Sequence, residues 1–394
     1  MKSPLPFLLA LAVTPAIANA PQDQAYLGIF VETHVMQIAG MPKIEMPQLP
    51  PGVKLPPNVM VMMPGRPHKT INVRLWSPSI APNNANAAIA PPSASKLGDK
   101  LDLDLFRPTS APTGGAGGFS GPNGKRQDFT VKIYWGSSET VRPGQPKVFS
   151  TKDMTPSQGM QMGAIMRSSM PQGGGGGHRG AQSYFYKEGW TTGYWPTDKQ
   201  PGEVADDATL PGTYALTTNY TGNVSIDAPS NVDFLAPIEI TSPDMATKPN
   251  LANSLPFHWN TIPNALGQYA SAFGMDQDNS TLILWCSSEV YAEQIMSDNG
   301  FLQMAEVKDA VDKKIFMPGD ATSVTIPAGI FNGVDFAALN MVGYGPGTAR
   351  DGVQPLPRIQ TKTSLMLMLG GKKMRDMDGL EDLVDRVGFE PTTR

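Results

Sequence analysis

Short segments of alternating hydrophobic and polar residues run along most of this chain, separated by Gly, Pro, Ser and Asn. Alternation with a period of two is typical of β-strands that have one apolar face. Such strands bury that face by packing sheet against sheet, so we expect antiparallel sheets with one solvated side. In the first half of the chain the predicted strands are 26–38, 70–76, 100–106, 128–135, 183–195 and 212–226.

From Leu255 onward the strand pattern is more regular. The predicted strands there are 255–259, 267–275, 281–290, 323–331, 336–344 and 364–369. Residues 291–316 instead carry apolar side chains at helical spacing, among them Leu302, Val307 and Val311, so we expect a helical insertion. Short strands separated by turns at these intervals are typical of a sandwich of two antiparallel sheets.

The segment LPFHWNTIPNALGQYASAF, residues 255–273, resembles the second and third strands of fibronectin type III-like and related immunoglobulin-like domains. In those domains a Trp on one strand and a Tyr on the next face the core. TSVTIPAGIF, residues 322–331, resembles the extended segment before their last hairpin. The helical insertion departs from that family, which leaves the strand order open.

Two segments of the chain are similar to each other: KIYWGSSETV at 132–141 and LILWCSSEVY at 282–291. We interpret them as an ancient duplication of one sandwich module; convergent chemistry at two strand ends is the alternative. Each strand would bury Trp135 or Trp285. Ser-Ser-Glu would then begin the outgoing turn, where side-chain oxygens accept backbone N–H bonds, so Glu139 and Glu289 are expected to be turn caps rather than catalytic acids.

Much of the chain also resembles a group of exported proteins of Gram-negative bacteria that has no established activity. The resemblance rests on YWGSSETVRPGQPKVF, SLPFHWNTIPNALGQY, LWCSSEV, TIPAGIF and YGPG, and it covers roughly residues 66–150 and 235–347. It implies export and a β-sandwich architecture. The predicted fold is therefore mainly β, with two immunoglobulin-like antiparallel β-sandwich modules, long Gly-, Pro- and Met-rich loops and a helical insertion in the second module.

The predicted organisation has five parts. They are a signal peptide at 1–20, an N-terminal strand and Pro-rich spacer at 21–66, a first sandwich at 67–233 with loops at 109–127 and 156–180, a second sandwich at 234–371, and a tail at 372–394. The tail ends in GFEPTTR, which is typical of a reading frame that runs through the T-arm of a transfer RNA gene. A genuine C-terminal helix and tail is the alternative.

The first residues predict export. A lysine near the terminal amine, an apolar run from Leu5 to Val13 and then small residues follow the order of a secretory signal peptide, with cleavage after Ala18 or Ala20. No later stretch is apolar enough to cross a bilayer, so we expect a periplasmic or extracellular protein that does not span the membrane. With Cys286 as the only cysteine, no disulfide can form within the chain.

Composition narrows the classes of partner. Gly 40 and Pro 38 favour turns and short strands over long helices. A net charge of -4 without basic blocks argues against nucleic acid as a partner. The histidines His34, His68, His178 and His258 are not spaced as metal ligands, and we expect neither a cofactor nor catalytic residues.

Two features suggest binding. The five methionines Met154, Met160, Met162, Met166 and Met170 could handle copper, although adaptable apolar filler is the favoured interpretation. The aromatic residues Tyr184, Tyr186, Trp190, Tyr194 and Trp195 form a candidate binding surface, with strand core and loop anchoring as the alternative.

We therefore expect a non-enzymatic binding or structural component of the cell envelope, with an unknown glycan or protein as its partner. An exported hydrolase that acts on glycans through a loop-built site is the first alternative. Periplasmic copper handling through the Met-rich loop is the second.

Overall fold

The computed structural model describes residues 24–41, 64–107, 130–150, 189–202, 204–276, 281–291, 300–334 and 336–370. These residues are mainly β, as the alternating pattern predicted. The one α-helix among them is α4 (Met304–Asp312), and Ser93–Ser95 form a short 3-10 helix. No helix in the described ranges is long and apolar enough to cross a membrane.

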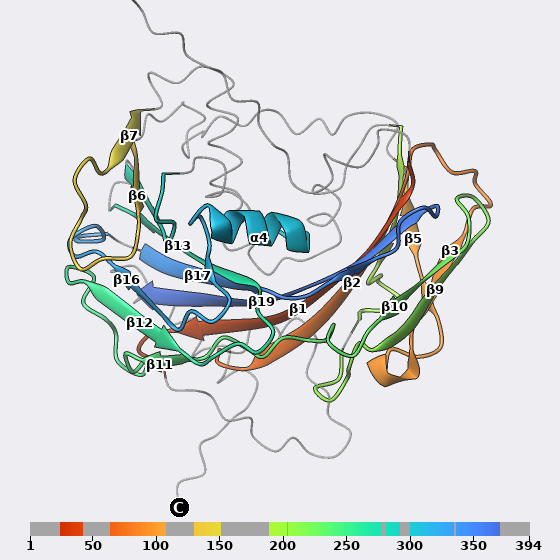
Figure 1. Ribbon diagram of the computed structural model, residues 1–394, viewed down its shortest axis with the longest axis horizontal. Helices are drawn as coiled ribbons and strands as arrows, with labels where there is room; N and C mark the ends of the chain where they lie inside the picture. The colour runs from red at the N-terminus through yellow and green to blue at the C-terminus, as the bar shows by residue number, and fades with distance from the viewer. Residues whose placement is uncertain are drawn as a thin grey trace, which may run out of the picture.

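The largest sheet has twelve strands in the order β5-β8-β2-β1-β19-β17-β13-β14-β6-β7, with β15 beside β13 and β18 beside β19. The strands are β1 (Tyr26–Ile38), β2 (Pro67–Ser77), β5 (Asp104–Phe106), β6 (Thr130–Trp135), β7 (Lys147–Ser150), β8 (Thr191–Trp195), β13 (Gly267–Met275), β14 (Thr281–Cys286), β15 (Met317–Pro318), β17 (Phe336–Tyr344), β18 (Thr348–Ala349) and β19 (Leu356–Gly370). Figure 1 shows this sheet as a curved layer that extends across the molecule.

Two smaller sheets accompany the large one. The first has the order β10-β9-β3-β4 and contains β3 (Ala87–Ala90), β4 (Leu101–Asp102), β9 (Gly212–Thr218) and β10 (Val224–Ala228). The second has the order β11-β12-β16 and contains β11 (Ile240–Ser242), β12 (Leu255–Trp259) and β16 (Ser323–Ile326). They lie at opposite ends of the large sheet (Figure 1).

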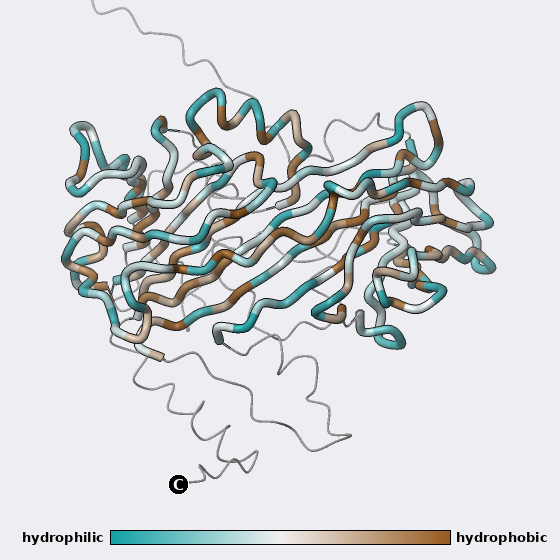
Figure 2. Tube along the Cα trace, turned by 60° about the horizontal axis from the view of Figure 1, so that its bottom comes forward, coloured by the Kyte–Doolittle hydropathy of each residue, from teal (hydrophilic) through white to brown (hydrophobic). Residues whose placement is uncertain are grey.

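Each small sheet shares a hydrophobic core with its own half of the large sheet. One core joins Ile29 of β1 to Leu216 of β9, and the other joins Trp285 of β14 to Phe257 of β12. Each large apolar side chain buried in this way contributes about 1.5–3 kcal/mol to folding. In Figure 2 the hydrophobic positions lie mainly along the strands and the hydrophilic positions mainly in the turns.

β1 and β19 form the centre of the large sheet. They run parallel, from the pair Tyr26 and Leu356 to the pair Ile38 and Met368, and β1 pairs on its other side with β2. Both strands contribute to both cores. We had expected residues 26–38 to form a strand outside the sandwiches; the structure places them centrally, and their burial on both faces requires that position.

Threonines mark the boundary between the two cores. Thr33 Oγ1 donates a hydrogen bond to the carbonyl of Leu235 at 2.8 Å, and Thr363 Oγ1 donates to the carbonyl of Thr33 at 3.1 Å. Thr361 Oγ1 donates to the carbonyl of Pro346 at 2.7 Å. These buried threonine hydroxyls thus all donate to backbone carbonyls.

The opposite face of the large sheet carries α4 and a third hydrophobic cluster. Val307 and Ala310 of the helix pack there with side chains of β13, β14 and β17. The backbone N–H of Gln303 donates to the Glu306 carboxylate at 2.7 Å, which caps the helix N-terminus. The helix lies within the predicted range 291–316, of which residues 292–299 fall outside the described part of the chain.

β6 lies far from its predicted neighbours. We expected 128–135 in the first sandwich with β2 and β5, but β6 pairs in parallel with β14 at the opposite end of the sheet from β5. Its buried Val131 and Ile133 belong to the same cluster as Leu282 and Leu284 of β14. This shared burial explains why β6 joins the second half.

Candidate functional site

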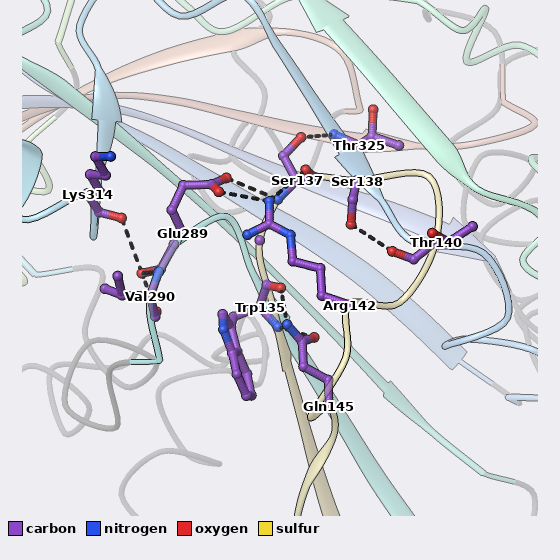
Figure 3. A network of polar contacts seen from close by, with 12 residues as sticks. Trp135, Ser137, Ser138, Thr140, Arg142, Gln145, Glu289, Val290, Lys314 and Thr325 are labelled. Atoms are coloured by element: carbon purple, nitrogen blue, oxygen red, sulfur yellow. Dashed lines mark hydrogen bonds and ion pairs between the residues drawn. The ribbon is translucent and has the colours of Figure 1, made fainter.

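The two Ser-Ser-Glu segments lie side by side, because they follow the neighbouring parallel strands β6 and β14 (Figure 3). The backbone N–H of Gly136 donates to the carbonyl of Cys286 at 2.9 Å. The indole of Trp285 donates to the carbonyl of Gly136 at 3.1 Å. The end of one strand therefore fixes the end of the other.

Glu289 connects its own segment to the turn after β6. Its carboxylate lies 2.8 Å from Nη2 of Arg142 and accepts a bond from the Ser137 backbone N–H at 3.4 Å. Arg142 also donates to the carbonyl of Ser137 at 3.0 Å. Glu289 thus contacts atoms of the turn that follows the other segment. Glu139 contributes through its main chain, since its carbonyl accepts a bond from Ala328 N–H at 2.9 Å.

The serines of the two segments make matching contacts. Ser137 Oγ accepts a bond from Thr325 N–H at 2.9 Å, and Ser287 Oγ accepts one from Ala270 N–H at 3.0 Å. The second serine of each segment donates to a carbonyl two residues later; these bonds are Ser138 to Thr140 at 2.8 Å and Ser288 to Val290 at 2.7 Å. The first serine of each segment thus bonds to the backbone of a neighbouring strand, and the second bonds within its own turn.

The two tryptophans occupy different environments. Trp135 is opposite Cys286 in the register, so it lies one residue out of step with Trp285 and faces the other side of the sheet. Trp285 is 0% exposed in the core beneath β12, whereas Trp135 is partly buried with its ring 5.0 Å from that of Tyr291. We had expected the two segments at corresponding places in two halves. That prediction is wrong, because both lie in one half.

The predicted aromatic surface is only partly described. Tyr184 and Tyr186 lie outside the described residues, as does the Met-rich loop. Trp195 is 1% exposed and lies in the core next to β9, so the prediction that it forms part of a binding surface is wrong. Alternation along β8 turns Tyr194 to the other face, where it is partly buried 6.0 Å from the Arg74 guanidinium. Trp190 is partly buried just before β8.

A different group of aromatic residues gathers on the α4 side of β1, β2 and β19. Its members are Tyr26, Phe30, Trp76 and Phe301, which we call the aromatic face. The Trp76 ring lies 5.3 Å from that of Tyr26 and 6.0 Å from that of Phe30. Phe301, just before α4, lies 5.0 Å from Phe30. Sequence analysis missed this group because its members lie on three separate segments.

Two cations lie over the partly exposed rings of the aromatic face. The Arg358 guanidinium is 5.8 Å from the Tyr26 centroid, and Lys362 Nζ is 4.5 Å from the Phe301 centroid. Burial raises the pKa of Tyr26 to about 12, against the lowering effect of Arg358 and with a further raising effect of Glu306. The Tyr26 hydroxyl is therefore neutral and can donate a hydrogen bond.

A polar cluster continues the same face along β1 and β19. Ser364 Oγ donates to the Glu32 carboxylate and lies 2.8 Å from His34 Nδ1, while Lys362 Nζ lies 3.5 Å from Glu32. The serine stands between carboxylate and imidazole. In a catalytic triad the imidazole stands in the middle, so this order does not match one.

No protein-family model matches this chain, and no curated protein matches it either.

One sequence signal pointed to the aromatic face. Four of the five even positions of residues 26–34 hold the large or polar residues Tyr26, Phe30, Glu32 and His34, and the fifth is Gly28, whereas Leu27, Ile29 and Val31 fill the core. The pattern marks a second face with its own chemistry. It does not identify the neighbouring strand, because the pairing with β19 joins residues 330 positions apart.

Proposed function

We propose that this protein is a non-enzymatic, exported component of the cell envelope that binds an envelope glycan through the aromatic face. The observation that carries the proposal is the pairing of two partly exposed rings with cations, Tyr26 with Arg358 and Phe301 with Lys362. Two immunoglobulin-like sandwich modules, fused through β1 and β19, would form the scaffold.

Aromatic rings with adjacent polar groups suit sugar recognition. Flat rings stack on the apolar faces of sugar rings, and polar tips and cations bind hydroxyl or acidic groups. Beneath Tyr26 and Phe301 lie Trp76, 5% exposed, and Phe30, 8% exposed. These buried rings hold the outer ones in place, which reduces the entropy lost on binding.

The position of the aromatic face also supports binding. Tyr26 and Arg358 are on the two central strands, which make the long parallel pairing from the pair Tyr26 and Leu356 onward. A site on such a rigid element keeps its geometry better than one on a loop.

Export is part of the same proposal. The backbone N–H of Leu356 donates to the carbonyl of Ala25 at 2.9 Å, so ordered pairing begins directly before β1. Cleavage after Ala18 or Ala20 would leave that pairing intact. Sequencing the N-terminus of the protein recovered from the periplasm or medium tests this part; a mature chain starting inside β1 would contradict it.

Binding is tested with the purified mature protein on an array of bacterial envelope glycans, followed by affinity measurement for the glycans retained. Tyr26→Ala and Phe301→Ala should each weaken binding at least about tenfold, the equivalent of 1.4 kcal/mol. Far-ultraviolet circular dichroism of each variant establishes that it is folded.

Phe234→Ala is the matched control. Lys69 Nζ lies 4.7 Å from the Phe234 centroid, so this is also a cation–aromatic pair beside β2. Phe234 packs against the core beneath the first small sheet, away from the aromatic face. Equal losses in all three variants, or binding of the wild type to no glycan on the array, would contradict the proposal.

A further inference from the structure

We propose that His34 and His68 form a binding site for a divalent transition-metal ion. The antiparallel register of β1 and β2 places these two histidines directly opposite each other. Opposite residues of an antiparallel pair project from the same face with Cβ atoms about 4.5–5.5 Å apart. Two imidazole nitrogens at about 2.0–2.1 Å from one ion fit that spacing.

Hydrogen bonding prepares the His34 ring for this role. Ser364 Oγ contacts both the Glu32 carboxylate and His34 Nδ1, the latter at 2.8 Å. A hydroxyl has one proton, and the carboxylate can only accept, so Ser364 donates to Glu32 and accepts from His34 Nδ1–H. The proton is thereby held on Nδ1, and the lone pair of Nε2 is left for an ion.

Such a relay is what metal-binding histidines generally have. The nitrogen that does not bind the ion donates to a carboxylate, carbonyl or water, which orients the ring and raises its basicity. In this protein the carboxylate acts through one serine hydroxyl. Ser364 and Glu32 are therefore positioning residues for His34.

Lys362 belongs to the same polar cluster as His34 and Glu32. Lys362 lies 3.5 Å from Glu32, so the carboxylate offsets much of the ammonium charge near the site.

The site would use only two protein side chains. No group of three or more His, Cys, Asp or Glu side chains within the described ranges is arranged to hold a metal ion. Water would complete the coordination, and binding would be weaker than at structural zinc sites with four protein ligands. Imidazole favours zinc, copper and nickel over magnesium and calcium.

The test is calorimetric titration of the tag-free full-length mature protein with Zn²⁺ and with Ni²⁺, each alone. Zinc and nickel are preferred as probes because thioether ligands select Cu(I), so methionines do not compete. The expected result is one ion per chain for the wild type and at least a tenfold loss of affinity in both His34→Gln and His68→Gln. Ser364→Ala should weaken binding about 10–100-fold while both imidazoles remain.

His258→Gln is the control, since His258 is exposed on β12 at the side of the second small sheet. Thermal melting of each variant shows whether it is folded. If one histidine variant fails to fold, the metal affinities of the other histidine variant and of Ser364→Ala still test the proposal. Absence of binding to wild-type protein at millimolar metal would overturn the proposal. Wild-type affinity in both histidine variants would overturn it as well.

Discussion

The Glu289 carboxylate lies 2.8 Å from the guanidinium of Arg142, so the residue that ends one Ser-Ser-Glu segment holds the turn that follows the other. This contact and the bond from Ser137 N–H make Glu289 a connector between two strand ends. The two similar segments are thus joined to each other in one half of the molecule.

Replacing Glu289 should cost little stability. The pair is partly solvated, with side-chain exposures of 32% for Arg142 and 45% for Glu289, so we expect Glu289→Gln to lower the free energy of unfolding by up to about 1 kcal/mol. Urea unfolding at low and high salt measures it, and the loss should shrink at high salt. Glu139→Gln is the control, because Glu139 is exposed and bonds to Ala328 through its main-chain carbonyl, which the substitution leaves in place. A larger loss in Glu139→Gln would contradict this assignment.

The two tryptophans should differ strongly in their contribution to stability. Trp285 is 0% exposed in the second core, so Trp285→Ala should cost about 3–5 kcal/mol. Trp135 is only partly buried, and Trp135→Ala should cost less than half as much. Chemical denaturation of both variants measures the difference. Equal costs would mean that the one-residue offset between β6 and β14 is wrong.

Replacing Thr33, at the boundary between the two cores, by valine of the same shape should lower the free energy of unfolding. Thr33→Val keeps the side-chain shape but leaves the buried carbonyl of Leu235 without its 2.8 Å donor, which should cost about 1–3 kcal/mol. Thr213→Val is the matched control, since Thr213 is exposed and bonds to Asp227. Equilibrium unfolding compares the two. An unchanged free energy of unfolding in Thr33→Val would contradict the role assigned to the Thr33 hydroxyl.

Stability should also depend on the protonation of His34. Burial holds its pKa below the ordinary value of about 6.5, so the unfolded chain binds the proton more readily than the folded chain. The stabilising contribution is therefore complete above about pH 6.5 and is lost as the pH falls toward the lower pKa of the folded state. Unfolding free energies between pH 8 and pH 5 should fall more steeply for the wild type than for His34→Gln; parallel curves would contradict this.

The strands of the second half could be predicted closely from sequence. Residues 255–259, 267–275 and 336–344 were predicted with the bounds that β12, β13 and β17 have. Each has turn residues at its ends, and alternation or an apolar run between them, so local information suffices. The mainly β class follows from the same pattern.

Pairing between distant segments could not be predicted in this way. β19 was expected to begin at Ser364 but begins at Leu356, because its first residues alternate only weakly and are ordered by pairing with β1. The aromatic face, the opposition of His34 and His68, and the inward direction of Trp195 all depend on such pairings. A period-two pattern predicts which face of a strand is buried, but it does not predict which strand pairs with it.

Both proposed sites depend on the central position of β1 between β2 and β19, because β19 supplies Arg358 and Lys362 to the aromatic face and Ser364 to the histidine pair. Met36 and Met366 are paired in that register, and both are partly exposed on the same face. The most direct measurement is therefore disulfide formation, by mass spectrometry after mild oxidation, in the double variant Met36→Cys/Met366→Cys. Paired strand residues lie within the distance that a disulfide spans.

The double variant Met36→Cys/Arg358→Cys is the control, because Arg358 pairs with Gly28, eight positions along β1 and about 26 Å from Met36. The parallel register predicts an intramolecular disulfide in Met36→Cys/Met366→Cys and none in Met36→Cys/Arg358→Cys. A disulfide in the control variant, or none in a folded Met36→Cys/Met366→Cys protein, would contradict the arrangement on which both sites depend.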